Sequence, residues 1–400
     1  MNGGEEIKRE IYEYALALKK IDTHCHHIAH IFYDSIGLKE IFDSSYVAWC
    51  HKPFGTYEER RESFRSIRDR SYFIWLERAL QRMYSINQPL NEDTWDIFDA
   101  AVRRADAADK HFSRLRGVCG YEHIIEDSYW NYGDNLGDAE LFTPTFRINI
   151  FMNGFDRTFV DQDRYCITKF FPEPVCDIGE YVEKMRAIIT QKHRQGCVSL
   201  KCAIAYERGL NFYPVSAADA QIALTTAREN LTKKNIDDFQ SYIFYRLCEI
   251  AAAEDIPFQI HTGLGQIEKT RALYLARAIK DNPNTNFVLF HLSFPYVDDV
   301  LSLGHNFDNV YPDICWVPLL STHTAIDALH RLLDSVNADK LCWGCDTWTA
   351  EESYGAVLAM AYALSEALSA RIEAGFMTLE RAKELCRMIL HDNAARIYRL

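Results

Sequence analysis

Near its N-terminus the chain reads Ile21-Asp22-Thr23-His24-Cys25-His26-His27, a segment in which two histidines, His24 and His26, stand two positions apart. In an extended strand, side chains two positions apart point to the same face of the sheet. Two imidazoles on one face can both reach one divalent metal ion. We therefore predict a strand over residues 20–24 that carries a pair of metal ligands at its C-terminal end.

The chain further on alternates between apolar strand segments and amphipathic helical segments. Helices are predicted over residues 180–195, 238–253, 322–335, 351–375 and 379–398 from apolar side chains at helical spacing. Strands are predicted over residues 20–24, 121–126, 145–152, 197–204, 257–261, 287–291, 309–313 and 340–346. Such alternation is typical of an α/β protein with a parallel sheet covered by helices. Eight strands are the number of a (β/α)8 TIM barrel, which is the fold we expect.

Residues 30–118 interrupt this alternation with a helical segment rich in aromatic residues. We interpret them as a helical insertion after strand 1, within one barrel domain over residues 1–400. The insertion carries a group of arginines that forms either a solvated helix face beside glutamates or an anion-binding lid over the barrel mouth. These arginines are Arg60, Arg61, Arg65, Arg68 and Arg70.

Other polar residues stand where later strands are expected to end. His261 ends the fifth strand, His291 the sixth and Asp346 the eighth, and Lys201 lies within the fourth. Active sites in such barrels lie at the C-terminal ends of the strands. A single buried histidine is most often a core residue with satisfied hydrogen bonds. Four histidines and an aspartate at one end of the barrel indicate a metal site instead.

The composition describes a folded, acidic chain. Of 400 residues, 48% are hydrophobic, and 44 basic against 57 acidic side chains give a net charge of −13. This balance excludes a disordered chain and disfavours nucleic-acid binding. With no run of eighteen apolar residues and a polar start, we expect no membrane span and no secretory signal. The twelve cysteines are then expected to be reduced core thiols of a cytoplasmic protein.

Several segments resemble the amidohydrolase superfamily, and in particular its amidohydrolase 2 branch of metal-dependent TIM-barrel hydrolases. They are Phe258-Gln259-Ile260-His261-Thr262-Gly263, Leu289-Phe290-His291-Leu292-Ser293-Phe294-Pro295-Tyr296 and Gly344-Cys345-Asp346. The stretch from Leu200 to Leu210 is similar to a strand-four signature of one subgroup of that branch. The resemblance covers nearly the whole chain and is specific to the superfamily, not to a substrate.

The resemblance implies a role for each matching residue. His24 and His26 would bind a first metal, and His261 and His291 would bind a second. Asp346 would contact the first metal and shuttle protons. In members with a single metal, His261 is instead the third ligand, and His291 contacts water or substrate.

Lys201 matches a strand-four lysine that is carboxylated in some members and then bridges two metals. An unmodified lysine is cationic and would repel the metals, so Lys201 is either carboxylated or turned to a substrate-binding or structural role. Zinc is the expected metal because imidazole and carboxylate are its usual ligands.

The implied activity is hydrolysis, in which metal-activated hydroxide attacks an amide, ester or lactone carbonyl of a small molecule. Asp346 and His291 are the catalytic candidates. Related branches include decarboxylases and uronate isomerases, and the latter share a helical insertion after strand one. A decarboxylase or an isomerase is therefore the first alternative, and a metal-binding scaffold without turnover is the second.

Residues close to the strand ends are candidates for substrate binding. Tyr206 and Arg208 follow strand four, Arg147 lies on strand three, and Tyr296 follows His291 by five residues. Arginine and tyrosine at such positions suit a small-molecule substrate that bears a carboxylate. Neither nucleic acid nor membrane is expected as a partner, and the aromatic insertion favours a homo-oligomer.

Three further residues lie near the same strand ends. His27 and His30 follow strand one and either line the mouth of the barrel or have no part in the site. Asp313 ends strand seven, where it could accept a hydrogen bond from a ligand histidine.

Overall fold

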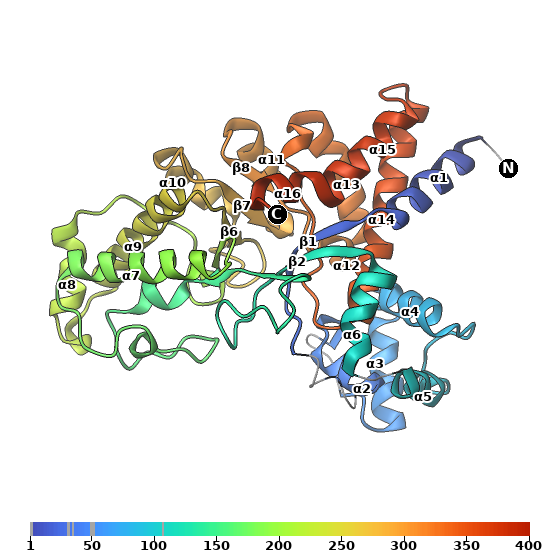
Figure 1. Cartoon of the computed structure of the whole chain (residues 1–400), viewed down its shortest axis with the longest axis horizontal. Helices are drawn as coiled ribbons and strands as arrows, with labels where there is room; N and C mark the ends of the chain where they lie inside the picture. The colour runs from blue at the N-terminus through green and yellow to red at the C-terminus, as the bar shows by residue number, and fades with distance from the viewer. Residues whose placement is uncertain (1–2, 30–32, 34–35, 49–52, 106–107) are drawn as a thin grey trace.

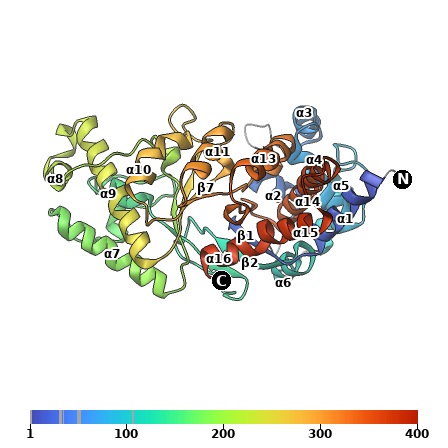
Figure 2. The same ribbon diagram turned by 90° about the horizontal axis from the view of Figure 1, so that it is seen from above.

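The computed structural model describes residues 3–29, 33, 36–48, 53–105 and 108–400. Short parallel strands form its centre, and helices lie around them (Figures 1 and 2). The strands are β1 (Lys20–Cys25), β2 (Tyr121–Glu126), β3 (Phe142–Pro144), β4 (Phe146–Arg147), β5 (Leu200–Cys202), β6 (Phe258–His261), β7 (Phe287–Phe290) and β8 (Val310–Pro312).

Hydrogen bonds join these strands into a closed barrel. The ladders run in the orders β1-β2-β3 and β4-β5-β6-β7-β8, and every pair is parallel. β3 and β4 are two halves of one strand around Thr145, whose N–H donates to a carbonyl of β2 (2.9 Å). Residues 342–346 take the eighth place, because they bridge to the end of β8 and the Asp346 N–H donates to the His24 carbonyl (2.8 Å). The predicted (β/α)8 TIM barrel is confirmed.

Helices follow the strands, as the periodicity predicts. They are α7 (Ile178–Arg194), α8 (Ala217–Thr225), α9 (Lys233–Glu254), α10 (Ala276–Asp281), α11 (Val297–Asn306), α12 (Val317–Leu320), α13 (Thr322–Ser335) and α14 (Ala350–Glu373). The side chains of Asp177, Thr232 and Thr349 accept backbone N–H bonds at the starts of α7, α9 and α14. These caps satisfy donors that a helix start leaves without a partner.

The segment between β1 and β2 is helical, as predicted for an insertion after strand 1. It contains α2 (Leu38–Ser44), a 3-10 turn at Tyr46–Ala48, α3 (Tyr57–Ile67), α4 (Ser71–Tyr84), α5 (Trp95–Ala105) and α6 (Ala108–Arg114). Aromatic side chains hold it together, with Phe54 stacked on Trp95 (5.7 Å between ring centroids). These rings belong to the same contiguous apolar core as the barrel strands.

Two predicted strand boundaries are wrong, and both errors fall in apolar segments. The third strand was expected over residues 145–152, but Asn149–Asn153 forms a 3-10 helix and the strand lies over 142–147. The fourth strand was expected over 197–204, but β5 is shorter and a 3-10 turn begins at Ile204. Buried strands and buried turns are equally apolar, so composition does not distinguish them.

The end of the chain also differs from its prediction. The helix expected over residues 379–398 is three elements: α15 (Leu379–Arg387), a π-helical turn at Met388–Asp392 and α16 (Asn393–Tyr398). α1 (Gly3–Ala17) packs against both α14 and α15. Among the helices of the described residues, none is long and apolar enough to cross a lipid bilayer.

Candidate metal centre

The barrel brings the predicted metal ligands together at the C-terminal ends of its strands. β1 and the residue after it supply one histidine each, β5 a lysine, β6 and the residue after β7 one histidine each, and the eighth segment an aspartate. All six side chains are buried. They are His24, His26, Lys201, His261, His291 and Asp346. Ligand atoms of His24, His26 and Asp346 lie within 4.8 Å of one another.

The β1 histidines face Asp346 and Lys201. His26 donates from Nδ1 to the carbonyl of Asp127 (2.9 Å), which leaves the lone pair of Nε2 facing Asp346 Oδ1 at 3.1 Å. His24 Nε2 lies 3.1 Å from Lys201 Nζ. Among the described residues, Asp346 Oδ1 has no hydrogen-bond donor. In this tautomer both atoms are acceptors, which suits two ligands of one metal ion.

His261 and His291 repeat this arrangement. His261 donates from Nε2 to the Leu264 carbonyl (2.7 Å), and His291 donates from Nδ1 to the Cys315 carbonyl (3.2 Å). Their other nitrogens face each other across 3.1 Å. Burial lowers the pKa of His291 to about 4 and that of His261 well below its ordinary value, so a shared proton is disfavoured. A divalent cation fits this set of acceptors.

Asp346 keeps its negative charge despite full burial. Burial alone would raise the pKa of Asp346, but His26, His291 and Lys201 outweigh it and hold the pKa below the ordinary range. Its backbone takes a left-handed conformation (φ +58°), as do the consecutive residues 291–293. Such backbone persists where the surroundings enforce it, and it is concentrated at functional sites.

Glycines allow the strand ends to approach closely. Gly344 lies against β1, and a Cβ there would come within 2.8 Å of the His24 nitrogen. Gly263 has φ +83°, and a Cβ on it would collide with the Phe294 carbonyl. Both glycines therefore hold the segments that carry His24, His261 and Asp346 at their short spacing.

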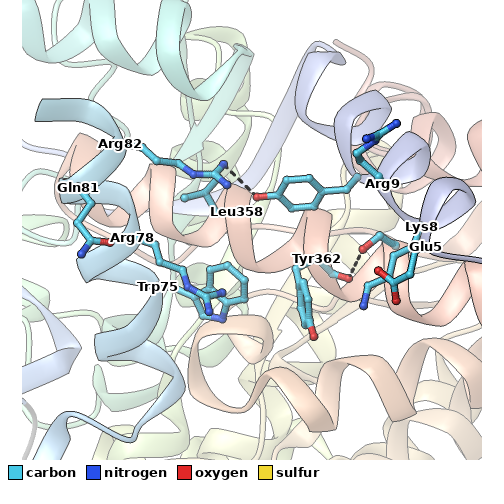
Figure 3. A pocket seen from close by; sticks show the side chains of 11 residues that line it. Glu5, Lys8, Arg9, Trp75, Arg78, Gln81, Arg82, Leu358 and Tyr362 are labelled. Atoms are coloured by element: carbon cyan, nitrogen blue, oxygen red, sulfur yellow. Dashed lines mark hydrogen bonds between the residues drawn. The ribbon is translucent and has the colours of Figure 1, made fainter. Parts of the chain in front are cut away.

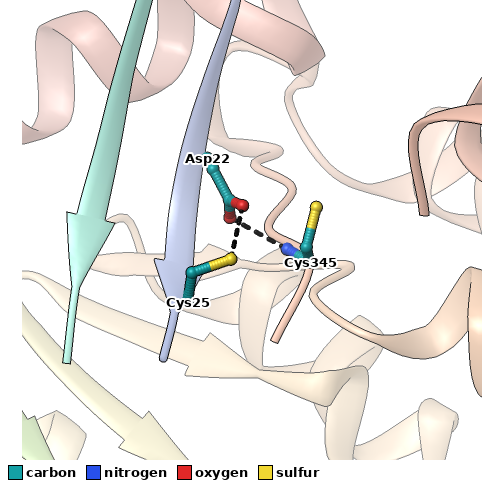
Figure 4. Close-up of side chains that lie close together, drawn as sticks. All are labelled: Asp22, Cys25 and Cys345. Carbon is teal, nitrogen blue, oxygen red and sulfur yellow. Dashed lines mark hydrogen bonds between the residues drawn. The ribbon is translucent and has the colours of Figure 1, made fainter. Parts of the chain in front are cut away.

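Asp22 links β1 to the eighth segment directly behind the site. Its carboxylate accepts from the backbone N–H groups of His24 (3.0 Å) and Cys345 (2.9 Å) and from the Cys25 thiol (2.8 Å; Figure 4). Burial raises the pKa of Asp22 to about 6. Asp22 thereby fixes the backbone next to two candidate ligands, His24 and Asp346.

Asp313 does not make the bond to a ligand histidine that the sequence suggested. Its carboxylate accepts from the Thr23 hydroxyl (2.7 Å) and the Cys315 N–H (2.9 Å). The Cys315 carbonyl in turn accepts from His291, so Asp313 acts on this histidine through one intermediate residue. Burial raises the pKa of Asp313 to about 7.

The site opens into a cavity of about 260 Å³. Five of the six candidate ligands line it, and the buried His291 lies behind them. Its other walls are aromatic and polar. They comprise Tyr46, Tyr129, Arg147, Gln162, Asp163, Ala203, Tyr206 and Trp348. The Trp348 ring stacks on His26 with 5.2 Å between centroids.

Two of the four predicted substrate-binding residues line this cavity. Tyr206 lies beside His261, with 4.7 Å between ring centroids. Arg147 is buried and held by two carboxylates, with Nη1 bonded to both oxygens of Asp163 (2.9 and 2.7 Å) and Nε to Asp127 (3.2 Å). The charge of the buried Arg147 is therefore balanced by two aspartates.

The remaining candidates lie elsewhere. Arg208 donates to the carbonyls of Gly209 and Asn211 and lines a different cavity. Tyr296 stands at the start of α11 under the guanidinium of Arg271 (4.8 Å to the ring centroid). His27 points away from the cavity and bonds the Trp348 carbonyl (3.0 Å). His30 lies outside the described residues.

Several residues of the site were not predicted from the sequence, among them Asp127, Asp163, Tyr46 and Cys315. Asp127, Asp163 and Tyr46 come from segments between strands, and Cys315 lies within 4.8 Å of ligand atoms of His291 and Asp346. For Asp127, the only signal was its place directly after the predicted strand 121–126. Tyr46 and Asp163 carried no signal, because their approach to the barrel depends on long-range packing.

The described contacts of the insertion arginines differ from one another. Arg60 and Arg61 bond within the insertion, to the Phe54 carbonyl (3.0 Å) and Glu58 (2.8 Å). Arg70 lines a second cavity of about 680 Å³, which shares Tyr46 with the metal-site cavity. At Arg70 the insertion therefore reaches the mouth of the barrel.

A closed (β/α)8 barrel with histidines and an aspartate gathered at its C-terminal strand ends defines the class of metal-dependent barrel enzymes. The family model described as Amidohydrolase matches residues 204–400. The match covers the part of the chain that carries His261, His291 and Asp346, and it agrees with the resemblance noted in the sequence.

A curated relative and several solved structures are similar to the chain. Protein fluG of Emericella nidulans is 26% identical over 221 residues, which are 51% of this chain and 26% of fluG. The chain thus spans about a quarter of that relative. A uronate isomerase of Thermotoga maritima has a TM-score of 0.80 at 14% identity, covering 98% of this chain and 97% of its own. A proposed metal-dependent hydrolase of Lactobacillus casei has a TM-score of 0.71 at 17% identity, covering 97% of each chain. These structures share the fold.

Proposed function

We propose that the protein is a metal-dependent hydrolase that adds water to an amide, ester or lactone carbonyl of a small molecule. The observation that carries this proposal is the set of acceptors gathered around Asp346. The lone pairs of His26, His261 and His291 all face the interior of the site, and each ring is fixed by a backbone carbonyl on its other nitrogen.

The metal, zinc in our proposal, would be held by the six candidate ligands, with His24, His26 and Asp346 on one ion. His261 and His291 would hold a second ion if Lys201 is carboxylated. Burial lowers the pKa of Lys201 to about 8, which favours the neutral amine that carboxylation requires. When bound, a divalent cation polarises a carbonyl and lowers the pKa of water toward neutrality.

The protein's own groups would handle the proton. Asp346 is ionised and has an oxygen without a donor, so it can accept the proton of the attacking water. It can then return that proton to the leaving group, as a general acid–base does.

The substrate that we propose is small and bears a carboxylate. Arg147 and Tyr206 are the groups on the cavity wall suited to hold it. The substrate carboxylate would replace Asp163 at Arg147, because Asp163 comes from a loop whereas Asp127 directly follows β2. A cytoplasmic homo-oligomer completes the proposal, on the basis of composition and the aromatic insertion.

The test is turnover in a broad panel of amides, esters, lactones, uronates and unsaturated acids, with Asp346→Asn as the paired variant. We expect hydrolysis of at least one carboxylate-bearing substrate, lost in Asp346→Asn while the metal content is kept. Asp298→Asn, at an exposed carboxylate of α11, is the matched control. Turnover confined to uronates or unsaturated acids would replace hydrolysis by isomerisation or decarboxylation.

A further inference from the structure

A further cavity, lined by residues of α1, α4 and α14, shares no lining residue with the metal-site cavity. It has a volume of about 590 Å³ and is bounded by α1, α4 and α14 (Figure 3). Volumes of this size are typical of sites for small organic ligands. The three helices pack against one another through α14, which gives the cavity a firm floor.

The walls of this cavity are positively charged although the chain is acidic. α1 and α4 contribute two lysine or arginine side chains each, against one carboxylate, Glu5. Lys8 is paired with Glu366, and Arg9 lies 3.9 Å from Glu13. In a chain of net charge −13, such a cationic recess attracts anions selectively.

Arg78 and Arg82 are the two cations left without a carboxylate. They stand one helical turn apart on α4, so they project on the same side. Among the described residues, neither has a carboxylate oxygen within 4.0 Å. Arg82 donates to the Tyr12 hydroxyl (3.1 Å), and Arg78 lies over the Trp75 ring (4.5 Å to its centroid). Both guanidiniums therefore have donors to spare for an incoming anion.

Aromatic rings stand beside these arginines. Trp75 is buried, and its Nε1 donates to the Thr322 hydroxyl (2.7 Å), which fixes the plane of the indole. Tyr362 contacts the Trp75 ring (5.5 Å between centroids), and Tyr12 also lines the cavity. Fixed aromatic planes next to paired guanidiniums suit a ligand that is itself both planar and anionic.

We propose that this cavity binds a small aromatic anion, that is, a planar ring carrying a phosphate or carboxylate group. The anionic group would bond Arg78 and Arg82, and the ring would lie against the aromatic side chains that line the cavity. This site is independent of the metal centre and of the reaction proposed for it.

The test is calorimetric titration of the purified, metal-loaded protein with AMP, phenyl phosphate and benzoate, each run separately. We expect saturable binding of at least one probe, with the phosphate probes and benzoate showing which anion is preferred. The double variant Arg78→Gln/Arg82→Gln should weaken that binding at least tenfold. Arg61→Gln/Arg65→Gln, with the same spacing on α3, should leave it unchanged.

A second readout locates the ligand without depending on those arginines. Probe binding should change indole fluorescence in the wild type, and Trp75→Phe should remove that change. Binding that persists at full strength in Arg78→Gln/Arg82→Gln would show that the probe binds elsewhere and would overturn the proposal. The absence of saturable binding by all three probes would overturn it as well.

Discussion

His261 Nδ1 and His291 Nε2 face each other across 3.1 Å, although the other nitrogen of each ring already donates to a backbone carbonyl. A neutral imidazole carries one proton, so both facing nitrogens present lone pairs. Burial keeps the pKa of both histidines low, so neither ring takes up a second proton. A bound cation would satisfy both facing lone pairs. The same reasoning applies to His26 Nε2 beside Asp346.

Lys201 determines how many metal ions the site holds. If it is carboxylated, Lys201→Met should lower the metal content from about two ions to one per chain or fewer, because the bridging ligand is lost. Native mass spectrometry of the wild type should show the added mass of one CO₂ on the chain. Lys184→Met, at an exposed lysine of α7, is the control. Equal metal content in wild type and Lys201→Met would contradict a bridging role.

Arg147 should matter more for stability than its partner Asp163. Arg147→Gln leaves two carboxylates without their cation, one of them buried, and we expect a loss of about 3–5 kcal/mol in the free energy of unfolding. Asp163→Asn leaves the bond between Arg147 and Asp127 intact and should cost about 1 kcal/mol. Urea denaturation at pH 7 with fixed metal measures both, and equal losses would argue against this ranking.

Tyr206→Phe should affect substrate binding more than folding. The hydroxyl lines the cavity beside His261, so its removal should raise KM about 5- to 50-fold and leave the thermal midpoint unchanged. Tyr213→Phe, outside this cavity, is the matched control. An unchanged KM for a carboxylate-bearing substrate would remove Tyr206 from the substrate site.

Glu207 should make stability depend on pH. Burial raises the pKa of Glu207 to about 7, so the folded state holds a proton that the unfolded state has released between about pH 4.5 and 7. Stability from this group therefore falls as pH rises through that window. Relative to wild type, Glu207→Gln should gain on the order of 2 kcal/mol between pH 5 and pH 8.

Urea denaturation of Glu207→Gln and wild type at both pH values checks this prediction. Glu183→Gln, at an exposed carboxylate of α7, should show no such gain. A difference between Glu207→Gln and wild type that is the same at pH 5 and pH 8 would mean that Glu207 does not titrate in this range.

The sequence predicts those parts of the site that strands carry. His24, Lys201 and His261 lie on strands, and His26 directly follows one, so their convergence is predictable from the period of two. Asp346 stands on a segment with little regular structure, but the place of the eighth strand was still apparent. Tyr46 and Asp163 depend on how loops fold back over the barrel, which local patterns do not encode.

In the fold as well, local features were predictable and long-range contacts were not. The helix predicted over residues 322–335 matches α13, since its apolar face and its end are local features. The third strand was misplaced because the apolar run at 148–152 turns into a 3-10 helix. There Asn149 Oδ1 accepts from the Ala203 N–H (2.8 Å), a contact between residues 54 positions apart. Long-range bonds of this kind override local propensity.

Metal content per chain tests the central claim most directly. Elemental analysis of protein purified without chelator or nickel should find one or two equivalents of a divalent cation, with zinc predominant. The double variant His24→Asn/His26→Asn should lose at least one equivalent, because it removes two ligands at the end of β1. If the wild type holds no metal even after reconstitution with zinc or manganese, the site is not a metal centre and the proposed hydrolysis fails with it.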